Sequence, residues 1–265
     1  MIRVNCFEPL VKMDCLTSGW RSHVEDLFFS PGSREIMFLK NLLERHSVLS
    51  VLDVACGNGD VALKLAKMGK SVTALDNDLA RVKKVHLKSI LAGVKLETLH
   101  GDMRDISSVY KQKCNLITCL RNALSRLLDE ADIWGTLGQM YLALEPGGVL
   151  VIQNFDYDRL FRENVSNLGE VDEYFYKQGV NVFFDQGIAK SGAKFIFEPS
   201  EQYTGAKKPT RVVIPVRPVF KKELDIWLVE MGFKIIEDYG ELTSGPLAGR
   251  AWHTVTAVYR PVPLA

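Results

Sequence analysis

A glycine-rich turn between two apolar segments constrains the fold of this chain more than any other feature. In the stretch VLDVACGNGDVALKLAKMGKSVTALDND, residues 51–78, an apolar run ends in Gly57 and Gly59, and a second apolar run ends in Asp76. The first run has the length of a buried strand, and the residues after the turn have the apolar spacing of a helix. This pattern indicates a ligand-binding βαβ unit: a strand, a turn with little side-chain bulk and a helix, with a carboxylate about twenty residues after the turn.

The same alternation of strand-like and helix-like segments continues along most of the chain. The sequence predicts seven core strands, at residues 49–53, 71–76, 95–100, 116–120, 149–155, 234–238 and 254–259. It predicts helices between them, at residues 60–68, 79–91, 106–110, 130–144 and 221–231. Strands that alternate with helices favour an α/β fold with a Rossmann-like, doubly wound and mainly parallel sheet.

One segment breaks this rhythm and indicates an insertion. Residues 180–185, 194–197 and 211–216 resemble strands with no helix between them, so we expect an antiparallel sheet there. The expected organisation is one domain in four parts. These are a helical N-terminal lid at 1–45, a Rossmann-like core at 46–155, an antiparallel substrate cap at 156–218 and the C-terminal part of the core at 219–265.

Composition and charge argue against several function classes. The formal net charge is +1, and a near-neutral chain is poorly suited to bind the phosphate backbone of nucleic acid. We expect no membrane partner, because no apolar run reaches the length of a signal core or a membrane span. The five cysteines are odd in number and lack metal-ligand spacing, as do the five histidines, so we expect no metal and a cytoplasmic location. The oligomeric state stays open.

The turn also limits the class of ligand that the site can bind. Gly57 and Gly59 let a ligand approach the backbone, and the start of the following helix favours a negatively charged group. Asp76 can accept hydrogen bonds from both hydroxyls of a ribose. A nucleoside that carries an acid fits this arrangement, and both a dinucleotide and S-adenosylmethionine meet that description. The turn has alanine, Ala62, where the dinucleotide motif G-x-G-x-x-G has its third glycine. Asp53 in the first strand suits the ammonium group of an amino-acid ligand, which favours S-adenosylmethionine.

Three motifs resemble the class I, Rossmann-like family of S-adenosylmethionine-dependent methyltransferases. The pattern Asp-x-Ala-Cys-Gly-x-Gly at 53–59 is similar to the family's cofactor turn, Gly-Asp-Met at 101–103 to its adenine-binding acidic loop, and 144–152 to its turn into the fifth strand. The resemblance implies S-adenosylmethionine as the cofactor. The cofactor contacts expected within these motifs and strand ends are Asp53, Ala55, Gly57, Gly59, Asp76, Asn77, Asp102, Met103 and Leu120.

A closer resemblance is to the glycine and sarcosine N-methyltransferases. Residues 120–127 and 152–158 look like the corresponding stretches of that family, and the N-terminal segment is similar as well. In those enzymes, N-terminal aromatic residues and an arginine close over the cofactor. The resemblance therefore makes Trp20 and Arg34 further candidate cofactor contacts.

Three residues depart from the pattern of the glycine enzymes and bear on the substrate. Phe155 stands where those enzymes have an arginine that clamps the substrate carboxylate, so glycine is not the expected acceptor. Arg121 stands where they have glycine, and Arg126 where histidine is common. These two arginines either form a new anion clamp or face solvent. We expect Arg121, Arg126 and Phe155 to contact the substrate.

The expected activity is transfer of a methyl group from S-adenosylmethionine to a heteroatom, preferably nitrogen, of a small molecule. Such an in-line displacement needs mainly positioning and exclusion of water. Asn122 and Tyr157 are the candidate catalytic residues, because an amine must lose its proton before it attacks. The alternatives are a methyltransferase acting on RNA or protein, and a catalytically silent subunit that only binds the cofactor.

Overall fold

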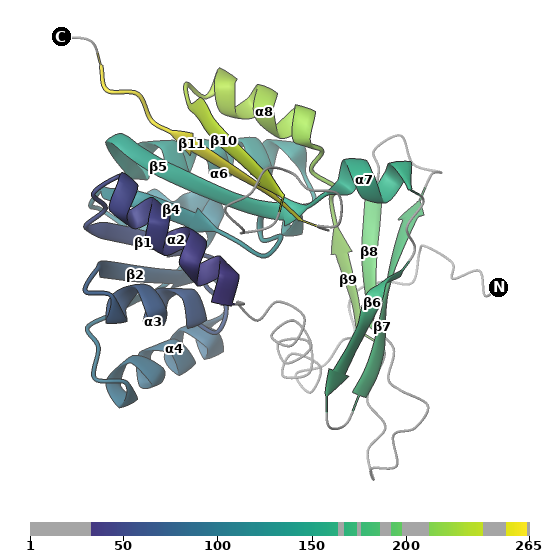
Figure 1. Cartoon of the computed structure of the whole chain (residues 1–265), viewed down its shortest axis with the longest axis horizontal. Helices are drawn as coiled ribbons and strands as arrows, with labels where there is room; N and C mark the ends of the chain where they lie inside the picture. The colour runs from purple at the N-terminus through teal and green to yellow at the C-terminus, as the bar shows by residue number, and fades with distance from the viewer. Residues whose placement is uncertain are drawn as a thin grey trace.

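The main sheet of the protein has seven strands and follows the predicted α/β pattern. The structure is a computed structural model and describes residues 33–163, 167–173, 176–185, 192–197, 212–240 and 253–263. The strands of this sheet are β1 Ser50–Val54, β2 Ser71–Asp76, β3 Glu97–His100, β4 Cys114–Cys119, β5 Leu144–Phe155, β10 Lys234–Gly240 and β11 His253–Tyr259. Their spatial order is β3-β2-β1-β4-β5-β11-β10 (Figure 1). Only β11 runs antiparallel to its neighbours, so the predicted doubly wound, mainly parallel seven-stranded sheet is confirmed.

Helices cover both faces of this sheet. The helices are α2 Ser33–Arg45, α3 Asp60–Lys67, α4 Leu79–Leu91, α5 Ile106–Val109, α6 Glu130–Ala143, α7 Tyr157–Arg162 and α8 Lys221–Glu230, with the 3-10 turns η1 Met103–Asp105 and η2 Leu124–Arg126. Alternate strand residues point to opposite faces. On β4, Leu116 packs with the core under α2, α3 and α4, whereas Ile117 packs with the core under α5, α6 and α8. Both faces of the central strands are therefore buried, which explains their nearly continuous apolar sequences.

The inserted segment forms a second, antiparallel sheet beside the main one (Figure 1). Its four strands, in the order β6-β7-β8-β9, are β6 Asn167–Glu173, β7 Tyr176–Asp185, β8 Gly192–Phe197 and β9 Val212–Val216. The sequence predicted the last three strands but not β6. The segment NLGEVDE is acidic and contains glycine, so its own preference for a strand is weak. It is a strand because it pairs with β7 at the edge of this sheet.

Two hydrogen bonds attach the ends of the insertion to the core. The backbone nitrogen of Arg217, just after β9, donates to the carbonyl oxygen of Ser125 in η2 at 2.9 Å. The backbone nitrogen of Lys221, at the start of α8, donates to Asp158 Oδ2 in α7 at 2.8 Å. The second sheet therefore joins the main sheet next to the loop that follows β4.

The predicted N-terminal lid falls largely outside the described residues, which begin at residue 33. The described end of that segment is α2, and its apolar face packs on the main sheet through Phe38, Leu39, Leu42 and Leu43. Residues 33–45 therefore contribute to the core. The rest of the lid, including Trp20, stays a prediction.

Gly59, at the start of α3, provides a test of how tightly the turn is packed. Its φ angle is +71°, and an added Cβ would lie 2.6 Å from Val85 Cγ1 in α4. Gly69 is the matched control, because its φ is +79° but an added Cβ meets nothing within 4 Å. We expect Gly69→Ala to cost about 1 kcal/mol through backbone strain alone, and Gly59→Ala to cost about 1–3 kcal/mol more through overpacking. Urea unfolding of both variants measures the difference, and equal losses would contradict this account.

Candidate functional site

The turn after β1 has an unusual backbone. Ala55, Gly57 and Gly59 all have positive φ angles, of +54°, +58° and +71°. The turn is attached to the end of β2, because the backbone nitrogen of Cys56 donates to the carbonyl oxygen of Leu75 at 3.0 Å. Glycine adopts such angles without strain, whereas Ala55 does so at a cost. The path of the chain between β1 and α3 is therefore a specific, held conformation.

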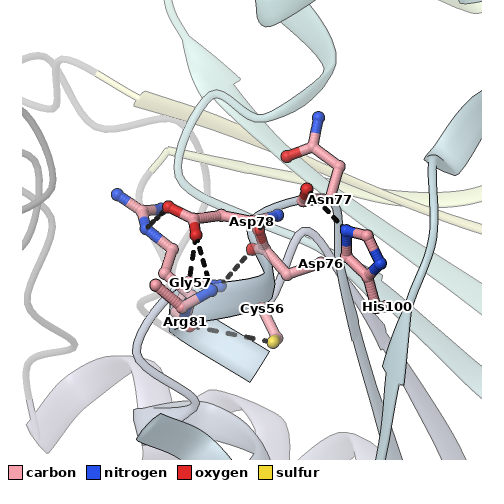
Figure 2. Close-up of polar contacts among 8 residues, drawn as sticks. Cys56, Gly57, Asp76, Asn77, Asp78, Arg81 and His100 are labelled. Atoms are coloured by element: carbon pink, nitrogen blue, oxygen red, sulfur yellow. Dashed lines mark hydrogen bonds and ion pairs between the residues drawn. The ribbon is translucent and has the colours of Figure 1, made fainter. Parts of the chain in front are cut away.

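Asp76 closes β2 and links this turn to the next one (Figure 2). Its Oδ2 accepts a hydrogen bond from the backbone nitrogen of Gly57 at 2.8 Å, and its Oδ1 accepts one from the backbone nitrogen of Asp78 at 2.9 Å. A carboxylate offers about four lone-pair positions, so each oxygen can accept one more donor. The side chain is only 5% exposed, and this burial raises its pKa from 3.8. Asp76 is thus a buried carboxylate with room for two further hydrogen bonds.

Polar residues surround the exposed side of Asp76. The carbonyl oxygen of Asn77 lies 3.1 Å from Nε2 of His100 at the end of β3. Asp78 caps α4 by accepting from the backbone nitrogen of Ala80 at 2.8 Å, and its Oδ2 lies 3.9 Å from Nε of Arg81. Figure 2 shows these groups together at the ends of β2 and β3. Arg81 therefore places a positive charge near the buried carboxylate.

Asp53 lies inside β1 on the same edge of the sheet. It is 3% exposed, and its Oδ1 accepts a hydrogen bond of 2.6 Å from the hydroxyl of Thr118, its neighbour on β4. Burial raises the pKa of Asp53 to about 6, although the Thr118 hydrogen bond and the charge of Arg121 act in the opposite direction. The carboxylate is therefore mainly ionised at neutral pH although it is buried. Buried carboxylates with raised pKa values are often found at functional sites.

Asp102 and Met103 follow β3. Arg104 holds both oxygens of Asp102, with Nε 3.0 Å from Oδ1 and Nη2 2.7 Å from Oδ2, and its Nη1 also donates to Asp132 in α6 at 3.0 Å. The hydrogen bond from Arg104 lowers the pKa of Asp102. Met103 is half-buried and packs against the core beneath α6. Asp102 is therefore held in a fixed orientation as a carboxylate.

The loop after β4 is strained and is held by one residue of the neighbouring strand. Arg121 and Asn122 both have positive φ angles, of +57° and +61°. Gln153 on β5 accepts from both of them, through Oε1 from the nitrogen of Arg121 at 3.0 Å and through its carbonyl oxygen from the nitrogen of Asn122 at 2.9 Å. Leu120 before them is buried. Sequence reasoning missed Gln153; the available signal was a polar residue directly after the apolar segment 149–152, inside a predicted buried strand.

The two predicted catalytic residues lie together but are buried. Asn122 and Tyr157 are each 1% exposed, and Nδ2 of Asn122 donates to the Tyr157 hydroxyl at 2.8 Å. Oδ1 of Asn122 accepts from the backbone nitrogen of Phe155 at 3.2 Å. Burial raises the pKa of Tyr157, so its phenol is neutral at physiological pH. The Phe155 ring is also 1% exposed and contacts Tyr157 edge-on, with 6.3 Å between the ring centroids.

The remaining predicted site residues are described only in part. Arg126 is half-buried at the end of η2, and its charge lowers the pKa of Tyr157 against the larger effect of burial. Arg34 belongs to α2, and its side chain lies outside the described part of the structure, as does the whole of Trp20. Most of the predicted site residues therefore lie at the ends of β1 to β5. The predictions for Trp20 and Arg34 stay untested.

The described residues form neither a membrane-spanning helix nor a cluster of metal ligands. None of the helices there is long and apolar enough to cross a membrane. In the same residues, no three histidine, cysteine or acidic side chains are grouped so that they could hold a metal ion.

Comparisons with known proteins agree with this geometry. A model of the methyltransferase domain matches residues 51–148. The chain is 26% identical over 210 residues to a glycine/sarcosine N-methyltransferase of Aphanothece halophytica, which covers 79% of this chain and 75% of that protein. It is 31% identical over 145 residues to a ubiquinone biosynthesis O-methyltransferase of Yersinia pestis, which covers 53% of this chain and 57% of that protein.

The fold is shared with a solved structure as well. A crystal structure of an S-adenosylmethionine-dependent methyltransferase from Clostridium acetobutylicum superposes with a TM-score of 0.76 at 15% identity, covering 93% of this chain and all of that one. The sheet order, the turn after β1 and these matches together show that the chain is a class I S-adenosylmethionine-dependent methyltransferase, with S-adenosylmethionine as its cofactor.

Proposed function

We propose that this enzyme transfers the methyl group of S-adenosylmethionine to a nitrogen atom of a small-molecule amine. The choice of nitrogen over oxygen as the methyl acceptor rests on one observation. The glycine/sarcosine N-methyltransferase of Aphanothece halophytica matches more than two thirds of both chains, whereas the O-methyltransferase match covers 53% of this chain. At 210 residues, the longer match must extend well beyond the core segment 46–155, into segments that would contact an acceptor in our proposal.

The cofactor fits the residues at the strand ends in one orientation. Asp76 has two free lone-pair positions, which suit the two hydroxyls of the ribose. Asp53 and the turn after β1 would receive the methionine part, with its ammonium group near the buried carboxylate. Asp102 and Met103, together with the backbone of Asn77, would receive the adenine. This chain's residues bind and orient the cofactor, which itself supplies the activated methyl group.

The acceptor nitrogen needs a free electron pair in line with the methyl group. Holding two reactants in this geometry can account for about 7–11 kcal/mol of a reaction barrier. Tyr157 is a poor general base because burial raises its pKa. We therefore propose that Asn122 and Tyr157 contribute by positioning the loop after β4, and that the amine loses its proton to water before it binds.

The remaining parts of the predicted organisation are proposals of the same kind. The antiparallel sheet of residues 156–218 would carry acceptor specificity, with Phe155 and Arg126 near its base. The N-terminal segment, with Trp20 and Arg34, would close over the cofactor. A cytoplasmic location is supported by three unpaired, buried cysteines in the described residues, namely Cys56, Cys114 and Cys119.

A second candidate function is transfer to a phenolic oxygen. It is favoured by the 31% identity to the ubiquinone biosynthesis O-methyltransferase of Yersinia pestis, which exceeds the identity to the N-methyltransferase. That match is shorter, however, at 145 residues against 210. A substrate screen separates the two candidates.

The screen supplies S-adenosylmethionine together with amines, amino acids and phenols, and detects methylated products by mass spectrometry. We expect at least one amine to be methylated, and no phenol to be methylated faster. A phenol as the best acceptor would replace the proposal by its rival. Binding of cofactor with no turnover of any compound would support a catalytically silent subunit instead.

The ribose role of Asp76 predicts a loss of cofactor affinity. We expect Asp76→Asn to weaken binding of S-adenosylhomocysteine at least tenfold, because charge-assisted hydrogen bonds contribute roughly 1.5–3 kcal/mol each. Isothermal titration calorimetry measures this change. Glu230→Gln, the same chemical change at an exposed residue of α8, is the control and should bind as the wild type does. Unchanged affinity in Asp76→Asn would remove Asp76 from the site.

The raised pKa of Asp53 predicts opposite effects on binding and on stability. Since the pKa is about 6, the carboxylate that attracts the cofactor's ammonium group is lost below that pH, so affinity for S-adenosylhomocysteine should fall between pH 8 and pH 5. Asp53→Asn should bind more weakly at pH 8 and lose this pH dependence. Titration calorimetry across the pH range tests both expectations.

The same carboxylate should destabilise the fold when it is ionised. An increase in pKa from 3.8 to about 6 corresponds to about 3 kcal/mol in the free energy of unfolding, a cost present above pH 6 and lost as the pH falls below the usual value. Asp53→Asn should therefore be more stable than the wild type in urea at pH 8, by up to that amount, and this advantage should shrink toward pH 4. A variant less stable than the wild type at pH 8 would contradict the buried-carboxylate account.

A further inference from the structure

Arg121, in the loop after β4, carries a pair of unpartnered hydrogen-bond donors. Its Nε and Nη2 atoms are buried, and neither has a hydrogen-bond partner among the residues that the structure describes. A buried charged group without partners is costly, so such groups are usually paired with an opposite charge. The residue as a whole is half-buried, which places the guanidinium just beneath the surface.

The two unpartnered atoms form one edge of the guanidinium. The N–H bonds of Nε and Nη2 are parallel, and their spacing matches the two oxygens of a carboxylate. The protein itself uses this edge elsewhere. Arg104 contacts Asp102 through the same two atoms, with Nε 3.0 Å from Oδ1 and Nη2 2.7 Å from Oδ2. In Arg121 the corresponding edge has no carboxylate within the described chain.

The backbone holds Arg121 at the edge of the sheet where strands β1 to β5 end and where the predicted site residues lie. Its φ angle of +57° is unfavourable for a side-chain-bearing residue, and Gln153 stabilises it by accepting from its backbone nitrogen at 3.0 Å. The guanidinium is also close enough to Asp53 for its charge to act on that carboxyl. Asp53 itself is engaged by the Thr118 hydroxyl at 2.6 Å. Arg121 therefore lies near the proposed position of the methionine part of the cofactor and of the acceptor.

We propose that the Nε–Nη2 edge of Arg121 binds the carboxylate of an amino-acid ligand in the active site. The inference rests on the proposed function for the position of the ligands, and it narrows the ligand class. The carboxylate belongs either to the acceptor, which is then an amino acid and not a simple amine, or to the methionine part of the cofactor. The chemistry of the clamp is the same in both cases.

Three variants test the clamp at Arg121. Arg121→Gln removes the charge. Arg121→Lys keeps the charge but lacks the two parallel N–H donors. Arg121→Gly removes the side chain, and glycine adopts the positive φ angle without strain. Arg121→Gly is therefore expected to fold even if the others are destabilised. Arg162→Gln, at a residue of α7 whose side chain is 68% exposed, is the control for loss of one positive charge.

Titration calorimetry distinguishes the two sources of the carboxylate. If the cofactor supplies it, the Arg121 variants should bind S-adenosylhomocysteine roughly 10- to 100-fold more weakly, and should bind 5′-methylthioadenosine, which lacks the amino-acid part, as the wild type does. If the acceptor supplies it, S-adenosylhomocysteine binding should be unchanged. Glycine, sarcosine and β-alanine, titrated into that complex, should then lose affinity in the variants, whereas their amides should not.

The clamp is refuted if neither pattern is found. That result would be unchanged S-adenosylhomocysteine affinity together with no carboxylate compound that binds the wild-type complex more tightly than its amide. These binding measurements do not depend on which atom receives the methyl group. Failure of the nitrogen proposal would show in the substrate screen alone, so the two failures are distinguishable.

Discussion

The hydrogen bonds accepted by Asp76 determine the shape of the proposed cofactor site. The carboxylate joins the turn after β1, through the nitrogen of Gly57 at 2.8 Å, to the start of α4, through the nitrogen of Asp78 at 2.9 Å. Without these acceptors, two backbone donors at a buried edge would lack partners. The same carboxylate thus stabilises both turns and keeps further lone pairs for the ligand that we propose. The two backbone hydrogen bonds offset part of the cost of burying this side chain.

The site concentrates energetic costs that the rest of the fold offsets. Among the described residues, Ser47, Ala55, Arg121 and Asn122 adopt left-handed backbone angles without being glycine, and all but Ser47 lie at this site. Asp53 is an ionisable group buried inside a strand there. Each left-handed residue costs about 1–2 kcal/mol. The partners that hold them come from neighbouring strands, as Gln153 on β5 does for the loop after β4. Costs gathered at one edge of a well-packed sheet are typical of a functional site.

The sequence was most informative where local and tertiary preferences agree. Helix α4 begins and ends as predicted, because Asp78 caps it and its apolar spacing is regular. The glycine turn and Asp76 also lie at the ends of β1 and β2 as predicted, because the strand–turn–helix pattern fixes their positions; their role in binding stays a prediction. Strand β6 was missed because its acidic sequence forms a strand only through pairing with β7. The strained backbone of Arg121 was equally hidden, because it depends on Gln153, a contact between residues 32 positions apart.

The buried position of Phe155 bears on where the proposed anion clamp lies, on β5 or on the loop after β4. Its ring is 1% exposed and packs against Tyr157, whose hydroxyl is hydrogen-bonded to Asn122. An arginine at 155 would have to bury its charge in this cluster, beside the neutral groups of Asn122, Ser125 and Tyr157. A charge on the loop avoids that cost, because Arg121 is half-buried and lies near the carboxylate of Asp53. Phenylalanine at 155 and arginine at 121, the two departures noted in the sequence, are therefore consistent with one proposed arrangement. In it, the interior around residue 155 is free of charge, and the positive charge lies on the loop after β4, at the edge of the sheet where we propose that ligands bind.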